Sequence, residues 1–386
     1  MVDRSKSNPN LQPLLFTPED FANCFFRKPS RREYEFLTYM TICRRLLGAD
    51  ELAKLDEVNE RGRTGYKLMS IFALLSLKLL YMQVTMKQTL ELVRGNDNLR
   101  QIIGVVEVPS EATVSRLSRP TQAIADVEVM MARVSALYSK ITGGIVGHLS
   151  VDSTTNEARE KPIKGKRASS EEHTPKKRGR KKKGSPEEAE YLAAKALEEE
   201  MRARYLAEPP EQSLSRLEKR CSLTAKMNSK GKRQWFIGYK THIACDGRGV
   251  PLAFAVTGAC VHDSQVAVPL MKLVRMNFVF LYALMDKGYV SPEIEEYIRM
   301  VGAKAIIDRP AYNGVPVPMD PATAQRYKAR TTVERTNSEL KDGFLPVKLY
   351  RKGENARYDI SLGVLLTTIK KVLAVVAMMQ EQRQAA

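Results

Sequence analysis

The chain has 386 residues, which allows two or three domains and a core that needs no disulfide or metal to hold it together. Its 62 Lys and Arg against 44 Asp and Glu leave a formal net charge of +18, which favours a polyanionic partner, with nucleic acid ahead of an acidic membrane. With 43% hydrophobic and 27% charged residues, the composition excludes a wholly disordered, fibrous or collagen-like chain.

Cysteine usage and hydropathy predict a cytoplasmic protein. The five cysteines are an odd number without a C-x-x-C spacing, which argues against a disulfide framework and a zinc knuckle. The first residues contain no apolar run of the kind found in signal peptides. The two most apolar segments, 68–82 and 360–379, are interrupted by lysines, so we expect buried amphipathic helices and no membrane span.

Residues 1–142 are predicted to form an all-helical N-terminal domain, because apolar residues recur there at helical spacing with almost no strand alternation. Within it, 86–93 is predicted to form one helix, and Ser110 is expected to cap a second helix over 111–117. This pair, with Arg116 near its end, resembles a helix-turn-helix motif. It is either a DNA-recognition element or simply two packed helices.

From Gly143 onward, short apolar strands alternate with helices, which predicts the α/β class. An unbroken apolar run predicts a central strand, buried on both faces, at 278–285. We expect one long helix over 325–341 and a C-terminal helix that begins near Asp359 within 346–386. The remaining predicted elements are a strand at 145–153, a hairpin of 235–245 and 251–260, a helix at 291–300 and a strand at 303–307.

A basic segment interrupts the α/β pattern. Residues 159–183 contain twelve Lys or Arg against three Glu, which predicts a loop that is disordered in the free protein and follows a phosphate backbone. An amphipathic helix is expected next, over 186–206. We therefore predict an insertion at 160–228 that divides the α/β domain into 143–159 and 229–345. Its densest basic residues are Lys176, Lys177, Arg178, Arg180, Lys181, Lys182 and Lys183.

Four polar residues recur on one side of the long helix predicted over 325–341. Tyr327, Arg330, Glu334 and Lys341 stand at i, i+3, i+7 and i+14, which places them within an arc of about 60° on an ideal helix. Such a stripe is either a solvated surface or the wall of an active site.

Two aspartates favour the active site. Asp152 and Asp286 each stand at the end of an apolar strand, and carboxylates at strand ends face the crevice of an open α/β sheet, although a single Asp at this point often just caps a turn. With Glu334 they make three carboxylates. Three carboxylates can hold a pair of hard divalent cations, which together bind the attacking and the leaving oxygen of a phosphodiester.

In this order the motifs resemble the DDE transposases of bacterial insertion sequences that carry a Tyr-x2-Arg-x3-Glu-x6-Lys signature. The resemblance rests on Asp152-Ser153-Thr154, Asp286-Lys287-Gly288-Tyr289 and the four residues from Tyr327 to Lys341. It extends to Gly238-Tyr239-Lys240-Thr241-His242 and His262-Asp263-Ser264, and spans about 62–345.

The resemblance implies a ribonuclease-H-like catalytic domain with a mixed sheet flanked by helices, and a helical N-terminal DNA-binding domain. It implies Mg²⁺ dependence, for which Mn²⁺ can substitute, with Asp152, Asp286 and Glu334 as catalytic metal ligands. Tyr327, Arg330 and Lys341 would hold double-stranded DNA, namely the terminal inverted repeats and the target. The resemblance also implies a homodimer in the DNA complex and a bacterial cytoplasmic location at the nucleoid. The short interval between Asp286 and Glu334 has little room for the β-rich insertion of some members, which leaves the hairpin-intermediate pathway open.

Several alternatives remain at the level of sequence. His242 and His262 are either metal ligands or, as we favour with oxygen-ligated Mg²⁺, structural or DNA-end residues. Asp263 and Glu157 could replace a ligand. Trp235 either stacks on an unpaired base or, as we favour, packs in the core. The whole chain could also be a metal-dependent nuclease without strand transfer, or an inactive, domesticated DNA-binding protein.

Overall fold

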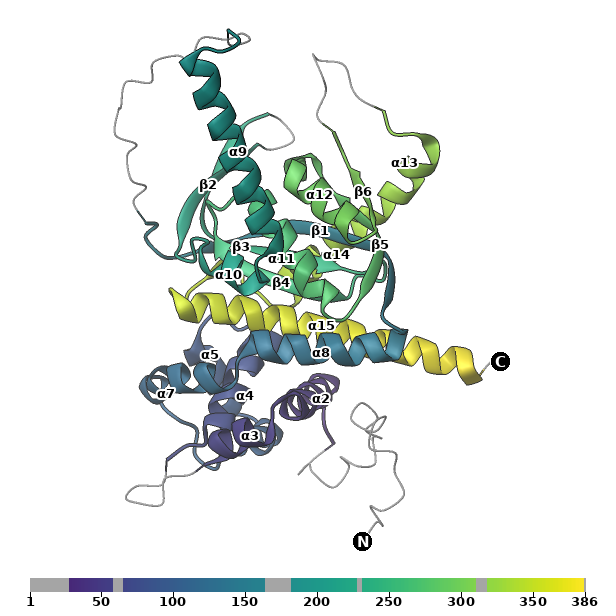
Figure 1. The fold of residues 1–386 in the computed structure, drawn as a ribbon. Coiled ribbons are helices and arrows are strands. Elements are labelled where there is room, and N and C mark those ends of the chain that lie inside the picture. Colours follow the sequence, from purple (N-terminus) through teal and green to yellow (C-terminus); the bar gives the residue numbers. More distant parts are fainter. Residues whose placement is uncertain (1–27, 58–64, 164–181, 228–230, 310–317, 385–386) are drawn as a thin grey trace.

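A mixed β-sheet forms the centre of the α/β part of the chain (Figure 1). The structure is a computed structural model, and it describes residues 28–57, 65–163, 182–227, 231–309 and 318–384. Every strand expected from the sequence is present. The seven strands in these ranges are β1 (Ile145–Ala158), β2 (Ser222–Met227), β3 (Arg233–Cys245), β4 (Pro251–Gly258), β5 (Val279–Met285), β6 (Lys304–Ile307) and β7 (Lys348–Leu349).

Strand β1 lies in the middle of this sheet. It pairs antiparallel with β3 on one side, and parallel with β5 and, at its far end, with β7 on the other. Strand β5 continues parallel to β6, while β3 carries β2 and β4 as antiparallel neighbours. The expected hairpin is β3–β4. Strand β5 is interior as predicted, but it is not buried on both faces throughout, because Val279 and Leu281 in its first half are exposed.

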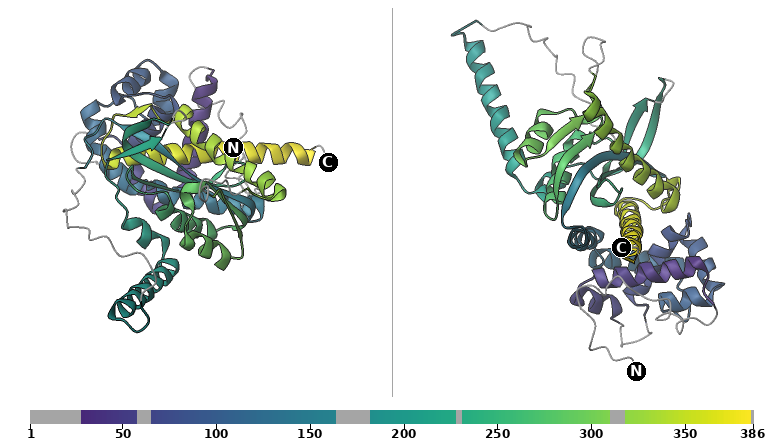
Figure 2. Two further views of the ribbon diagram at one scale, coloured as in Figure 1. Left: turned by 90° about the horizontal axis from the view of Figure 1, so that it is seen from above. Right: turned by 90° about the vertical axis from the view of Figure 1, so that its right-hand side faces the viewer.

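Two hydrophobic clusters cover the two faces of the sheet, as the alternation of side chains along a strand requires. On one face Leu149 and Val151 pack with Val266 of α11 (Ser264–Arg275), on the side where α12 (Pro292–Met300) also lies. On the other face Ile243 packs with Val333 of α14 (Thr331–Gly343) and with the first half of α15 (Glu354–Gln384). Figure 2 shows these layers from two further directions.

Within the predicted N-terminal domain, the described residues 28–57 and 65–142 contain helices and no strand. Its helices are α2 (Arg31–Leu46), α3 (Ala49–Asp56), α4 (Leu68–Leu80), α5 (Met86–Arg94), α6 (Asp97–Ile103), α7 (Glu111–Ile124) and α8 (Val127–Thr142). Ser110 caps α7 by accepting a hydrogen bond from the backbone of Thr113. The predicted helix-turn-helix pair is not consecutive, because a third helix, α6, with its own cap at Asn96, lies between α5 and α7.

Helix α15 joins the two parts of the molecule. It starts at Glu354, earlier than the predicted Asp359, and lies between the N-terminal helices and the sheet (Figure 1). By length and composition it could cross a membrane, yet 56% of its most apolar 18-residue window is buried inside the protein. Every residue from Asp359 to Ile369 is buried, which agrees with the prediction of a buried helix. This stretch has no solvent-facing side, so it is not amphipathic as expected.

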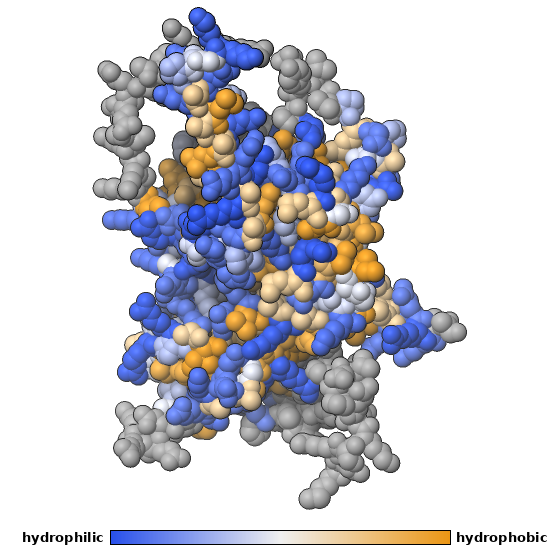
Figure 3. All heavy atoms as spheres, in the orientation of Figure 1, coloured by the Kyte–Doolittle hydropathy of each residue, from blue (hydrophilic) through white to orange (hydrophobic). Residues whose placement is uncertain are grey.

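Two predicted segments differ in detail. The helix expected over 325–341 is divided into α13 (Pro321–Tyr327), the 3₁₀ turn η3 (Lys328–Arg330) and α14. The range 160–228 contains α9 (Pro186–Ala207), α10 (Pro210–Ser215) and also β2, which belongs to the sheet because it pairs along β3. Helix α9 projects from the body of the protein and exposes apolar side chains along its length (Figure 3).

Candidate active site

The pairing of β1 with β5 brings Asp152 and Asp286 together. These strands run parallel with Ser150 opposite Leu284, so the two aspartates, each two residues further on, occupy neighbouring positions on the same face of the sheet. Asp152 does not end its strand as expected: β1 continues to Ala158 because its pairing with β3 runs on to Glu157, and within it Asp152 pairs with Ile243. Asp286 follows the end of β5, and its Oδ1 accepts a hydrogen bond of 2.9 Å from the backbone N–H of Gly288.

The segment α13–η3–α14 crosses this face beside the two aspartates. Arg326 of α13 stacks over the ring of Tyr282 in β5, 5.1 Å from its centroid, and η3 contacts both β1 and β5. Arg330 lies 5.5 Å from the ring centroid of Tyr327, and it donates a hydrogen bond of 2.6 Å to the carboxylate of Glu334. The stripe predicted on one helix face therefore adjoins both aspartates, although the helix is interrupted.

Asp152 is affected by the charges of both other predicted ligands. Burial raises the pKa of Asp152 to about 6, and the negative charges of Asp286 and Glu334 add to this rise. The Arg330 guanidinium acts in the opposite sense. Partial burial also raises the pKa of Tyr327, with a contribution from Asp286. Burial and the two carboxylates thus outweigh the charge of Arg330 at Asp152.

The donor set fits a hard divalent cation. Aspartate and glutamate oxygens are the ligands that Mg²⁺ prefers, and mutually repelling carboxylates of this kind are stabilised by a shared cation. Within the described ranges, however, no three His, Cys, Asp or Glu side chains lie close enough to form a metal site. In this arrangement Glu334 is bound to Arg330 and is 46% exposed. Glu334 would have to leave Arg330 to join the aspartates.

Lys341 lies further along α14. It is half-buried, and its pKa is lowered by burial and by the nearby charge of Lys226, while Glu157 and Asp152 are close enough to oppose this effect. Glu157, which the sequence left open as a substitute ligand, forms an ion pair of 3.0 Å with Lys348. Lys341 and Lys226 thus place positive charge beside the carboxylates, where a phosphate can be held.

The histidines and Asp263 are occupied elsewhere. His242 is fully buried, its Nε2 lies 2.9 Å from the Thr257 hydroxyl, and burial lowers its pKa to about 4. His242 pairs with Ser153, the neighbour of Asp152 that points to the opposite face. Asp263 accepts a hydrogen bond of 2.9 Å from Lys240. His262 is exposed and contacts Ser264, so each of the three has a partner other than the predicted ligands.

The expectation that Trp235 packs in the core is wrong. Its side chain is 61% exposed, and Arg233 lies 5.8 Å from its ring centroid. The reason is that this half of β3 is paired only with β2, so it forms a hairpin that reaches past the layers of helices. Trp235 is therefore available to a ligand.

The basic residues expected to contact DNA outside the 327–341 segment fall into three groups. Lys176, Lys177, Arg178, Arg180 and Lys181 lie outside the described residues. Lys182 and Lys183 are exposed just before α9. Arg116 is exposed on α7, on the far side of α15 from the sheet.

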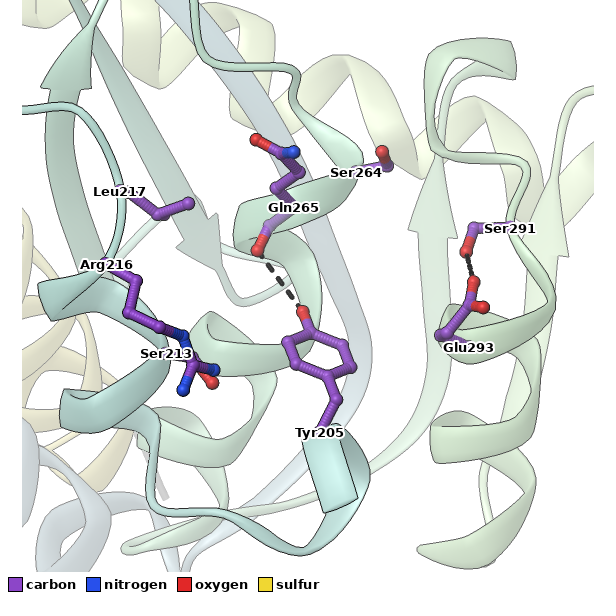
Figure 4. A pocket seen from close by; sticks show the side chains of 8 residues that line it. All are labelled: Tyr205, Ser213, Arg216, Leu217, Ser264, Gln265, Ser291 and Glu293. Carbon is purple, nitrogen blue, oxygen red and sulfur yellow. Dashed lines mark hydrogen bonds between the residues drawn. The ribbon is translucent and has the colours of Figure 1, made fainter. Parts of the chain in front are cut away.

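A separate pocket of about 290 Å³ lies where α9 and α10 meet the first turns of α11 and α12 (Figure 4). Tyr205 donates a hydrogen bond across it to the backbone oxygen of Gln265. Arg216, which lines it, is already bound to Glu208. None of the residues predicted for the active site lines this pocket.

One residue of the site, Asn337, was missed by the reasoning from sequence. Its side-chain Nδ2 donates a hydrogen bond of 3.0 Å to Oδ2 of Asp152, and it is 6% exposed. It lies three residues after Glu334, within the x6 interval of the signature, where the motif specifies no residue. Its helical spacing from Glu334 was the available signal.

Comparison with known proteins agrees with this geometry. Residues 210–367 match the family model described as Transposase DDE domain. The match supports a DDE-type transposase family. It covers Asp286 and the residues from Tyr327 to Lys341, whereas Asp152 lies before it and is joined to it through the pairing of β1 with β3 and β5. A transposase domain implies DNA as a partner. No curated protein and no solved structure matches the chain.

Proposed function

We propose that the chain is the transposase of a bacterial insertion sequence, acting on DNA by a metal-dependent DDE mechanism. The observation that carries the proposal is the juxtaposition of Asp152 and Asp286 on neighbouring parallel strands, with the Glu334 helix laid across them. The domain match over 210–367 supports the same assignment. The strand order, with three antiparallel strands followed by two parallel ones, favours a ribonuclease-H-like catalytic domain.

The proposed domains are a helical DNA-binding domain at 1–142, a split catalytic domain at 143–159 and 229–345, an insertion at 160–228 and a C-terminal helix at 346–386. The protein would work in the bacterial cytoplasm, bound to the nucleoid, and as a homodimer on two element ends. Its substrates would be the terminal inverted repeats and a target DNA. The basic stretch at 159–183 is proposed to contact the phosphate backbone.

In this proposal the cation, Mg²⁺ or Mn²⁺, would be held by Asp152, Asp286 and Glu334. When bound, it would activate a water or a 3′-hydroxyl and stabilise the leaving oxygen. Arg330 has two tasks. It neutralises Glu334 in the metal-free protein, at 2.6 Å, and it is free to bind a DNA phosphate once Glu334 turns toward the aspartates. Lys341 places a second cation near the phosphate. Tyr327, packed on Arg330, orients the DNA end.

The test compares wild type with Glu334→Gln on a labelled duplex that carries the element end, with Mg²⁺ and a target plasmid. Glu339→Gln is the matched control, because Glu339 lies on the same helix with a similar exposure, 47% against 46%, but pairs with Lys371. We expect joining to plasmid by wild type and by the control, and loss of cleavage and joining in Glu334→Gln.

Two other results would replace the proposal. Cleavage without joining to the plasmid would identify a metal-dependent nuclease. Binding of the duplex without cleavage or joining by wild type would identify an inactive DNA-binding protein. Equal activity of wild type and Glu334→Gln would show that Glu334 is not a metal ligand.

A further inference from the structure

Asn337 is the residue of α14 that touches an active-site carboxylate in this structure. Its Nδ2 lies 3.0 Å from Oδ2 of Asp152, across 185 residues of sequence. Glu334, on the same helix, is turned away toward Arg330. The contact that fixes α14 against this part of β1 is therefore made by the amide and not by the glutamate.

This contact is buried, which makes it directional. Asn337 is 6% exposed, and an amide that donates to a carboxylate at this depth holds the carboxylate in one orientation. The neighbouring Val333 and Leu340 are fully buried in the core beneath α14 and keep the helix from rotating. Asp152 is thus held on the side that faces α14, the side from which Glu334 must approach.

The second polar atom of Asn337 remains available. Its Oδ1 is buried and accepts no hydrogen bond from any residue in the described ranges. Buried amide oxygens are normally paired, so this atom is suited to a donor that enters with the substrate or the cation, such as a water molecule.

We propose that Asn337 is a positioning residue, which orients Asp152 for the divalent cation and sets the distance at which Glu334 completes the site. The inference rests on the proposed function, because it assigns Asn337 a role toward the cation of that same site. It follows a general pattern in which a hydrogen bond behind a ligand orients it, and in which loss of such a bond weakens metal affinity by about 10- to 100-fold.

The test measures Mn²⁺ binding to the full-length protein without DNA, from the electron paramagnetic resonance signal of free Mn²⁺. Asn337→Leu keeps the approximate volume and removes both polar atoms, and Asn337→Ala is a second variant that cannot clash if leucine impairs folding. Thr336→Val is the matched control, since Thr336 is also buried on α14 but donates to the carbonyl of Gly249. The Mn²⁺ binding that is lost in Asp152→Asn is taken as the binding at the active site.

We expect both Asn337 variants to weaken the Asp152-dependent Mn²⁺ binding by about 10-fold or more. Thr336→Val should lower thermal stability and leave Mn²⁺ binding as in wild type. Unchanged binding in folded Asn337 variants, or equal weakening by Thr336→Val, would overturn the positioning role while the proposed function stands. If Asp152→Asn binds Mn²⁺ as wild type does, the proposed metal site itself is wrong.

Discussion

Asp152 should destabilise the metal-free protein, and this can be measured. Its pKa is raised from the ordinary 3.8 to about 6 by burial and by Asp286 and Glu334. A carboxyl with a raised folded-state pKa loses stabilisation as pH rises from its unfolded to its folded value, here between about pH 4 and pH 6. Two pKa units correspond to about 3 kcal/mol, all of it lost at pH 7.

The perturbation is Asp152→Asn, which keeps the shape and removes the charge. At pH 7.5 in EDTA we expect the variant to be about 3 kcal/mol more stable than wild type, and at pH 4 the difference should shrink toward zero. The assay is urea unfolding followed by circular dichroism at both pH values. Asp342→Asn, an exposed carboxylate on α14, is the control and should differ from wild type by less than about 0.5 kcal/mol at either pH.

Added Mg²⁺ should reverse the order, because a cation bound by the folded state stabilises wild type and not the variant. The reasoning is refuted if Asp152→Asn is less stable than wild type at pH 7.5 in EDTA, or if the stability difference does not change with pH. Either result would mean that the carboxylate is already compensated by Arg330 and Asn337 in the metal-free protein.

Two further predictions concern other contacts. Asp359→Asn leaves Lys78, whose side chain is 2% exposed and 2.7 Å from Asp359, as a buried unpaired charge, so unfolding should become easier by about 3–5 kcal/mol. The double variant Lys78→Met/Asp359→Leu should recover the free energy of unfolding of wild type, because no charge is then left unpaired. A double variant as unstable as Asp359→Asn would attribute the loss to the Arg351–Asp359 contact instead. Trp235→Ala should leave the melting temperature unchanged and weaken binding of a duplex with unpaired end bases by about 1–3 kcal/mol, seen by fluorescence anisotropy; unchanged affinity would contradict stacking.

Local pattern was enough to predict most elements and the class of the fold. Apolar runs and turn residues predicted β1, β5 and the β3–β4 hairpin, and helical spacing predicted α9 and the N-terminal helices. Order along the chain also predicted Asp152, Asp286 and Glu334 as one site. The strand end expected at Asp152 is wrong, because β1 continues to Ala158, whereas Asp286 does follow the end of β5. These signals depend on the residues within one element and its immediate neighbours.

Only the tertiary structure decided what these elements touch. Asp152 and Asp286 adjoin because β1 and β5 pair in parallel after a long crossover, and no local pattern fixes that register. The same holds for Asn337, whose meaning depends on a partner 185 residues away, and for Glu334, which is paired with Arg330. Trp235 looked like a core residue by composition, but exposure depends on which strands and helices cover a segment, and that is settled only when the whole chain packs.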